Sequence, residues 1–399
     1  MAETRWLTVV GVGEDGPDGL PPASRAALEA AEVVMGPPRH LALLPDLAAE
    51  RIPWPVPFAD GLPLLRGLRG RRVAVLASGD PFWFGTGSVL AREFPREEWR
   101  ALPAPSTFSL AAARLGWAVE HTPCLGLHAA PFGRLRRQLA PGARALVLLR
   151  DGAAVVAMAD WLTDLGFGAT RIRVMEALGG PRERLREAAA EALAFDDIAH
   201  PVCVALEVAG AGPTIPAATG WPDDLFDHDG QITKRPIRAL ALSALAPRAG
   251  EHLWDIGAGS GSVGIEWLAC HAACTATAVE ADPARAARLR ANADALGADR
   301  LGLIEGHAPS ALEGLDAPDA VFIGGGLSEA LLEGLWTRLA PGTRLVAHAV
   351  TLESEALLAG WHGAKGGGLL RIELAEARPL GRRHGWQARY PVVQWSVVR

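Results

Sequence analysis

The chain has 399 residues, of which 49% are hydrophobic and 21% are charged, and its formal net charge at pH 7 is −6. A chain of this length is too long for one ordinary hydrophobic core, so we expect two domains. The acidic balance argues against a general surface for nucleic acid or an anionic membrane, which needs a basic excess. It still allows a local basic pocket for a carboxylate-rich substrate.

Cysteine usage and apolar runs bear on the compartment. The cysteines form no Cys-x-x-Cys pair and share no spacing with a His cluster, so we expect no metal site. Scattered thiols are typical of a reducing cytoplasm. The first fifteen residues carry acids and one short apolar run, unlike a signal peptide, and no stretch reaches the ~20 apolar residues of a bilayer span. The sequence therefore predicts a cytoplasmic protein. The four cysteines are Cys124, Cys203, Cys270 and Cys274.

Strand-like and helix-like segments alternate through the first half of the chain. The glycine loop Gly11-Val-Gly13-Glu-Asp-Gly16 follows the first strand, and Ser78-Gly79-Asp80-Pro81 follows the second. Pro105-Ser106-Thr107 precedes an amphipathic helix over 108–115. This alternation predicts α/β layers with mostly parallel strand pairing. Strands are expected at 7–10, 73–76, 146–149, 172–175 and 202–208.

Residues 209–224 are rich in Gly and Pro and lack periodicity, which makes them the best linker candidate. They separate a first domain over 1–208 from a second over 225–399. The second begins with a helix over 236–245, and its strands predict a parallel sheet finished by a C-terminal hairpin. Those strands are expected at 252–256, 277–279, 301–304, 320–323, 344–349, 369–374 and 392–397.

The strongest local motif is Asp255-Ile256-Gly257-Ala258-Gly259-Ser260-Gly261, between a strand and a helix. Glycines there let the backbone turn tightly and approach a ligand closely. Glu280 ends the next strand, where a carboxylate can accept hydrogen bonds from both ribose hydroxyls. The motif therefore predicts a nucleoside-containing ligand.

Other interpretations of these loops stay open. The run from Gly259 to Gly264 also satisfies a dinucleotide fingerprint, although dinucleotide folds usually keep an apolar residue where Asp255 stands. A glycine-rich turn without a ligand is the third possibility. The loop from Gly11 to Gly16 matches the same fingerprint, but its helix is expected about eight residues later, too far to cradle a pyrophosphate.

Several segments of the second half resemble the decarboxylating precorrin methyltransferases. The segments are Thr233-Lys234-Arg235-Pro236-Ile237-Arg238, residues 253–266, and Val321-Phe-Ile-Gly-Gly-Gly326. The resemblance implies a Rossmann-like class I methyltransferase domain that uses S-adenosylmethionine (SAM). This chain departs from the family at Gly306-His307-Ala308-Pro309-Ser310, where relatives usually read Gly-Asp-Ala-Pro-Glu. The residues implied to contact SAM are Thr233, Asp255, Gly257, Ala258, Gly259, Ser260, Gly261, Glu280 and Ala308.

The first half resembles the tetrapyrrole methylases, through the glycine loop, Ser78-Gly79-Asp80-Pro81, Pro105-Ser106-Thr107 and the stretch 176–184. Taken singly, these segments are ordinary turns and a helix N-cap. Their order implies a fold of two α/β lobes with SAM between them, contacted by Gly79, Asp80, Ser106 and Thr107. The bulky Phe82-Trp83-Phe84 is a departure that we expect to reshape the macrocycle cleft.

The order of the two halves resembles the fused C5,15-methyltransferases of cobalamin biosynthesis. The resemblance implies methylation of precorrin-6B at carbons 5 and 15 with loss of the ring C acetate carboxyl, giving precorrin-8. It also implies two SAM sites per chain and a homo-oligomer. We expect Lys234 and Arg238 to clamp substrate carboxylates, because Arg and Lys bind such groups well. The alternatives are a cobalt-containing substrate, an RNA methyltransferase, or a non-catalytic SAM-binding scaffold.

Overall fold

The structure is a computed structural model that describes residues 5–399. Residues 1–4, which belong to the predicted first domain and to the first fifteen residues discussed above, lie outside the described residues. The chain divides into two compact units. The first comprises the residues up to Ala130 and Gln138–Gly212, and the second comprises Pro131–Arg137 and Pro213–Arg399.

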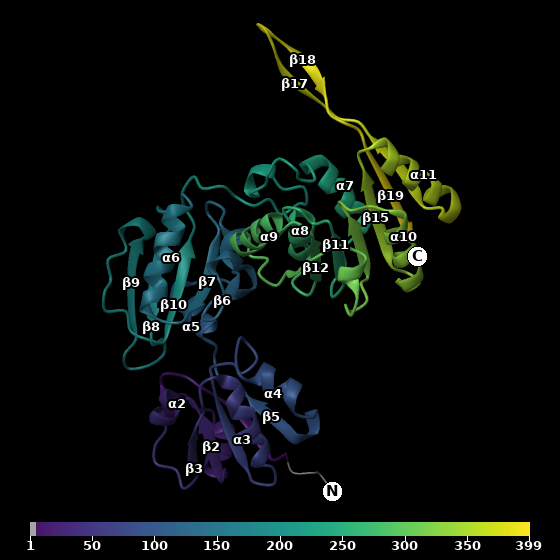
Figure 1. Ribbon diagram of the computed structural model, residues 1–399. Helices are drawn as coiled ribbons and strands as arrows, with labels where there is room; N and C mark the ends of the chain where they lie inside the picture. The colour runs from purple at the N-terminus through teal and green to yellow at the C-terminus, as the bar shows by residue number, and fades with distance from the viewer. Residues whose placement is uncertain (1–4) are drawn as a thin grey trace. The chain divides into compact units, whose positions relative to one another are not determined.

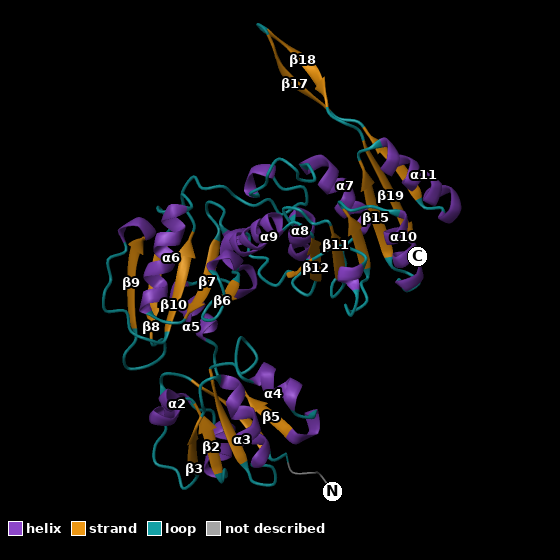
Figure 2. Cartoon of the chain, viewed as in Figure 1, coloured by secondary structure: helices purple, strands orange, loops and turns teal. Residues whose placement is uncertain are grey.

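Within residues 5–399 the strands form two sheets of five strands, one of seven and a separate two-stranded hairpin (Figures 1 and 2). The α/β class predicted from the sequence is therefore confirmed. In the same part of the chain, no helix is both long and apolar enough to cross a membrane.

The first lobe of the first unit is a parallel sheet in the order β3-β2-β4-β1-β5. Successive residues of its inner strands are buried on opposite faces, so both faces carry helices. Its strands are β1 (Leu7–Val12), β2 (Val33–Gly36), β3 (Glu50–Pro53), β4 (Val73–Ser78) and β5 (Trp99–Leu102). Its helices are α1 (Pro22–Glu29), α2 (Pro38–Leu43), α3 (Gly61–Gly67) and α4 (Gly87–Glu93).

Pairing in the first unit is mostly parallel, as predicted, but the second lobe is an exception. Its sheet has the order β6-β7-β10-β8-β9, and only β6 and β7 are parallel. Strand β9, which is not expected from the sequence, turns straight back onto β8 without a crossover helix, and β10 runs antiparallel to both β7 and β8. The strands are β6 (Cys124–Gly126), β7 (Arg144–Leu149), β8 (Arg171–Glu176), β9 (Arg184–Ala189) and β10 (Val202–Glu207), with helices α5 (Thr107–Leu115) and α6 (Gly152–Asp164).

The second unit contains the seven-stranded sheet, in the order β13-β12-β11-β14-β15-β19-β16. The pairs from β13 to β15 are parallel, whereas β19 pairs antiparallel with β15 and β16. The strand order reverses between β11 and β14, which makes that point the expected ligand crevice. The strands are β11 (His252–Ile256), β12 (Thr275–Glu280), β13 (Gly302–Glu305), β14 (Ala320–Ile323), β15 (Arg344–Ala349), β16 (Gly368–Ile372) and β19 (Val392–Val398).

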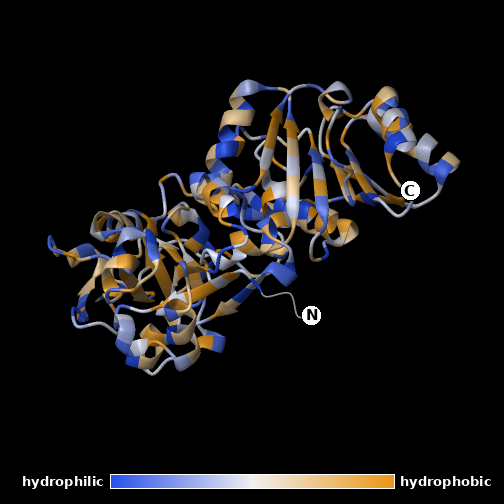
Figure 3. Ribbon diagram, turned by 90° about the horizontal axis from the view of Figure 1, so that it is seen from below, coloured by the Kyte–Doolittle hydropathy of each residue, from blue (hydrophilic) through white to orange (hydrophobic). Residues whose placement is uncertain are grey.

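Two apolar layers cover the faces of this sheet, which appears as hydrophobic strands between helices in Figure 3. Side chains from α7, α8 and α9 pack on one face, around Trp267 and Phe322. Side chains from α10 and α11 pack on the other, around Trp361 and Trp395. The helices are α7 (Arg235–Leu245), α8 (Ser262–Cys270), α9 (Pro283–Ala295), α10 (Glu329–Arg338) and α11 (Leu352–Lys365).

A segment from the first half of the sequence belongs to the second unit. The 3₁₀ helix η5 (Phe132–Gln138) begins there, and Arg134 forms two hydrogen bonds of 2.9 Å with the Asp299 carboxylate. A Cβ on Gly133 would lie 1.9 Å from the Asp294 carbonyl oxygen, so only glycine fits. The second unit therefore needs residues 131–137 as well as the C-terminal half.

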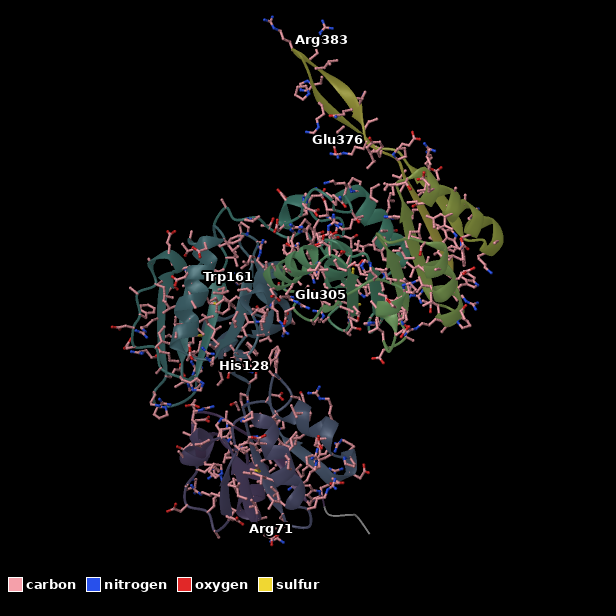
Figure 4. The ribbon with its side chains drawn as sticks, viewed as in Figure 1. Arg71, His128, Trp161, Glu305, Glu376 and Arg383 are labelled. Carbon is pink, nitrogen blue, oxygen red and sulfur yellow. The ribbon has the colours of Figure 1, made fainter. Side chains whose placement is uncertain are left out.

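The remaining strands, β17 (Ala375–Leu380) and β18 (Arg383–Ala388), pair only with each other. This hairpin extends from the second unit, and Figure 4 labels Glu376 and Arg383 on it. The sequence predicts a C-terminal hairpin formed by 369–374 and 392–397. Those segments do pair, as β16 and β19, but the tight turn lies in the missed hairpin between them.

Candidate active site

A cavity of about 740 Å³ opens at the carboxyl ends of β11, β12, β14 and β15. This volume lies within the range of pockets that enclose a cofactor-sized ligand. The cavity is at the point where the strand order reverses. Its lining includes Gln231, Thr233, Lys234, Ile237, Gly257–Ser260, Glu280, Arg285, His307, Ala308, Gly324–Gly326, His348, Val350 and Val392.

The glycine loop between β11 and α8 forms one wall. Gly257, Gly259 and Gly261 have φ values of +65°, +58° and +77°, which only glycine adopts without strain. A Cβ on Gly257 would lie 2.6 Å from the backbone of Gly325, so the loops after β11 and β14 are in direct contact. Backbone groups of both loops can therefore approach a ligand closely.

Glu280 ends β12 and faces this loop. Its carboxylate accepts hydrogen bonds from the backbone N–H of Gly259 at 2.7 Å and of Asp282 at 2.9 Å. One bond engages each oxygen, and a carboxylate offers about four acceptor positions. Glu280 thus holds the glycine loop and keeps capacity for ribose hydroxyls.

Asp255 lies beneath the cavity and is absent from its lining, although it was predicted to contact SAM. One carboxylate oxygen accepts a hydrogen bond from the Gly264 N–H at 2.9 Å, and the other is buried without a partner. Burial raises the pKa of Asp255 to about 7. Its contact is with the first turn of α8, which it positions.

Lys234 and Arg238, predicted together as carboxylate clamps, lie in different environments. Lys234 lines the cavity, with its ammonium 4.0 Å from Asp223. Arg238 is fully buried, and its guanidinium bonds to Glu266, Asp223 and the carbonyls of Trp221 and Thr233. Arg238 is therefore not positioned to bind a substrate, because each nitrogen of its buried guanidinium already donates a hydrogen bond within the protein.

The far side of the cavity holds His348, which was not expected from the sequence and which contacts Gln394 outside the lining. His348 on β15 and Gln394 on β19 are directly opposite in the antiparallel register, and His348 Nε2 lies 2.9 Å from Gln394 Oε1. The His348 ring also packs edge-on against Phe322 at 5.0 Å. The available signal was a polar residue at an inward position of each otherwise apolar strand.

The first unit has a smaller cavity, of about 60 Å³, between its two lobes. Gly79 and Thr107 line it, whereas Asp80 and Ser106 do not. Asp80 accepts a hydrogen bond from the Phe82 N–H at 2.8 Å, and Ser106 caps α5 by accepting one from the Ser109 N–H at 3.1 Å. Two of the four predicted residues thus make the turn and cap contacts expected of those residue types.

An ion cluster that the sequence analysis missed borders this cavity. Glu14 pairs with Arg39 and with Arg182, the latter at 3.2 Å, and both Glu14 and Arg39 line the cavity. His40 beside them is buried, and desolvation lowers its pKa to about 3, so it is neutral. The cluster places two guanidinium groups near the cleft, where carboxylates of a substrate could bind.

Among residues 5–399, no group of three or more His, Cys, Asp or Glu side chains has the geometry of a metal site.

Comparison with known proteins covers both units. Residues 6–194 match the tetrapyrrole (corrin/porphyrin) methylases, and residues 224–399 match the precorrin methyltransferase domain family. A precorrin-6Y C(5,15)-methyltransferase [decarboxylating] from a Sinorhizobium species is 48% identical over 99% of this chain and 96% of its own length. The chain belongs to the precorrin-6Y C5,15-methyltransferase (decarboxylating) family. It is therefore a methyltransferase, as the sequence predicted.

Two further matches cover the second half alone. The cobalt-precorrin-6B C(15)-methyltransferase (decarboxylating) of Salmonella typhimurium is 35% identical over 43% of this chain and 91% of its own length. The crystal structure of the C-terminal domain of a Rhodobacter capsulatus precorrin-6Y C5,15-methyltransferase is 53% identical and covers 46% of this chain and 100% of that one, with a TM-score of 0.45.

Proposed function

We propose that this enzyme methylates precorrin-6B at carbons 5 and 15 and removes the ring C acetate carboxyl, giving precorrin-8 for cobalamin. The observation that carries the proposal is the cavity of about 740 Å³, where a glycine loop, the Glu280 carboxylate and Lys234 face one space. The names of full-length relatives support the substrate.

The second unit is proposed to carry out methylation at carbon 15 and the decarboxylation. Bound SAM supplies an activated methyl group. Gly257–Gly261 and Glu280 would hold its nucleoside, with Ala308 and Thr233 beside it. The cavity walls would align the reacting carbon with the methyl group, which lowers the barrier mainly through orientation. Lys234 would hold a substrate carboxylate at the rim, and the exposed Val350 offers an apolar surface to the macrocycle.

The first unit is proposed to hold a second SAM between its lobes and to methylate carbon 5. Its cavity of about 60 Å³ is smaller than a typical ligand pocket. Binding there must separate Glu14 from Arg39, since this pair lies against the cavity. Arg39 would then be free to engage a substrate carboxylate, while Arg182 stays paired with Glu14. We further propose that residues 209–224 connect the two activities, with Trp221 anchored in the core of the second unit.

We also propose that the chain forms a homo-oligomer through the β17–β18 hairpin. Every residue of the two strands except Gly385 is exposed, and Leu380 and Trp386 are 71% and 79% exposed. A two-stranded hairpin is only marginally stable alone in water. Pairing its free edges with those of a second copy would satisfy them.

Equilibrium dialysis of the full chain against radiolabelled SAM tests the two-site proposal. Wild type should bind two molecules per chain. Glu280→Gln and Thr107→Leu, which fills the first cavity, should each lower this to one. Binding of one molecule by wild type, lost entirely in Glu280→Gln, would contradict a site in the first unit. Incubation with a cobalt-containing precorrin instead of precorrin-6B distinguishes the two substrate classes.

A further inference from the structure

His348 lies on the side of the large cavity away from the nucleoside loop. Glu280 and the loop after β11 form one end, and β15, two strands from β11, brings His348 to the other. A ligand held by the loop after β11 leaves space for a second reactant over β14 and β15, because the strand order reverses between β11 and β14. His348 therefore faces the part of the cavity that a macrocycle would enter.

The ring of His348 has one nitrogen committed and one available. Nε2 lies 2.9 Å from Gln394 Oε1, an atom that only accepts hydrogen bonds, so Nε2 carries the proton. In a neutral imidazole Nδ1 is then an acceptor. Among the described residues, Nδ1 has no hydrogen-bond partner in the protein. Burial lowers the pKa of His348, which keeps the ring neutral near pH 7.

The supporting contacts fix this arrangement. Gln394 is 5% exposed, and its position opposite His348 is set by the β15–β19 register. Phe322 packs edge-on against the ring and prevents it from turning away. The ring therefore presents a single basic nitrogen, Nδ1, beside the cavity.

We propose that His348 accepts the proton released from the macrocycle carbon methylated in the second unit, and that Gln394 positions it. The inference rests on the proposed function. Replacement of hydrogen by methyl forms a C–C bond from a macrocycle electron pair, while the donor sulfur keeps the pair of its broken C–S bond. The C–H bond at that carbon then breaks, its electron pair returns to the conjugated system, and the proton goes to Nδ1.

Loss of the acetate carboxyl requires a proton donor rather than a proton acceptor. The pair of the broken C–C bond stays on the acetate CH₂ carbon as carbon dioxide leaves, and that carbon takes up one proton to become a methyl group. A protonated His348 in the same cavity can supply it. One imidazole can thus serve both proton transfers, because one releases a proton and the other consumes one.

Single-turnover kinetics with precorrin-6B and SAM test the proposal in the full chain. His348→Gln fills similar space and keeps an amide near Gln394, but it accepts no proton. We expect carbon-15 methylation to slow about 100-fold or more, the usual contribution of a general base, with SAM affinity and melting temperature close to wild type. Imidazole should restore part of the rate to His348→Ala. His271→Gln, which changes an exposed histidine outside the cavity lining, is the matched control.

A second readout does not depend on turnover. In the ¹⁵N-histidine spectrum of the full chain, the signal lost in His348→Gln should report a neutral ring protonated at Nε2. Gln394→Leu should change that tautomer balance. A His348→Gln rate within threefold of wild type, or a ring protonated at Nδ1, would overturn the proposal. If wild type makes no product while the spectrum shows the Nε2 tautomer, the failure lies with the substrate assignment of the proposed function.

Discussion

The guanidinium of Arg238 donates a hydrogen bond to the backbone carbonyl of Thr233, a residue that lines the large cavity. The same guanidinium pairs with Glu266, whose carboxylate accepts hydrogen bonds from Gly220 and Trp221 N–H at 2.6 and 2.9 Å. Arg238 and Glu266 are both buried. This pair fixes the segment that covers the cavity, so an arginine expected to bind substrate instead shapes the wall.

Arg238→Met should destabilise the second unit by about 3–5 kcal/mol, because it leaves the buried Glu266 carboxylate without its charged partner. Urea unfolding measures this change. Lys234→Met is the comparison one turn away: it should leave the unfolding midpoint unchanged and raise KM for the macrocycle. Equal stability of the two variants would contradict the structural role of Arg238.

Glu280→Gln should weaken SAM binding at the second site by at least about tenfold, since a charged acceptor contributes more than a neutral one. Isothermal titration measures the affinity. Glu305→Gln is the matched control, because Glu305 stands opposite Glu280 on β13 but outside the cavity lining (Figure 4). An equal loss in both variants would point to a general charge effect.

Asp255 predicts an unusual pH dependence of stability. Its pKa is raised from 3.8 to about 7, so between these values the folded state keeps a proton that the unfolded state has lost. Stability must then fall as the pH rises from about 4 to about 7, by up to about 1.4 kcal/mol per pH unit. Asp255→Asn should remove this slope in urea titrations.

Asp299 should contribute to stability with the opposite pH dependence to Asp255. Its hydrogen bonds to Arg134 lower the pKa of its carboxyl, so its stabilising contribution is present above the unfolded pKa and is lost at lower pH. Asp299→Asn should therefore destabilise the protein at pH 7 and have little effect near pH 3. A pH slope that is the same in Asp255→Asn and wild type would rule out a protonated Asp255.

Gly257→Ala and Gly259→Ala separate crowding from backbone strain. Both residues have positive φ, so both substitutions carry a cost of about 1–3 kcal/mol. Only at Gly257 would the Cβ meet neighbouring backbone, 2.6 Å from Gly325, whereas at Gly259 the closest atom is 3.8 Å away. Gly257→Ala should have the lower melting temperature, as measured by calorimetry.

Leu380→Ser combined with Trp386→Ser tests the hairpin. Light scattering should give a smaller assembly than wild type, because exposed apolar side chains on a free edge are removed. SAM binding should stay unchanged, since neither residue lines a cavity that we describe. A wild type that is already monomeric would contradict this interface.

Local patterns determine how much of the fold can be predicted from the sequence. The strands over 252–256, 320–323 and 344–349 have the predicted bounds, because each is a mostly apolar segment that ends sharply. β9 (Arg184–Ala189) mixes charged and apolar residues without a long apolar run, so it was not expected as a strand. Arg184 and Arg186 both pair with the buried Glu176 on β8, a contact that sequence spacing does not reveal.

Some residues of the candidate site can likewise be predicted from local sequence, whereas others are brought together only by the fold. The glycine loop and Glu280 follow one another along the chain within a β-α-β unit, so their meeting could be predicted. His348 and Gln394 lie on strands far apart in sequence, and only the antiparallel register joins them. Arg238 looked like a ligand because helical spacing cannot tell which side of a helix is buried against Glu266.

The mass of the macrocycle after incubation with SAM tests the central claim most directly. The full chain should convert precorrin-6B into a product that has gained two methyl groups and lost one carbon dioxide. Glu280→Gln should give a product with the carbon-5 methyl alone and no loss of carbon dioxide. An unchanged macrocycle mass, from a chain that binds SAM, would contradict the proposed substrate.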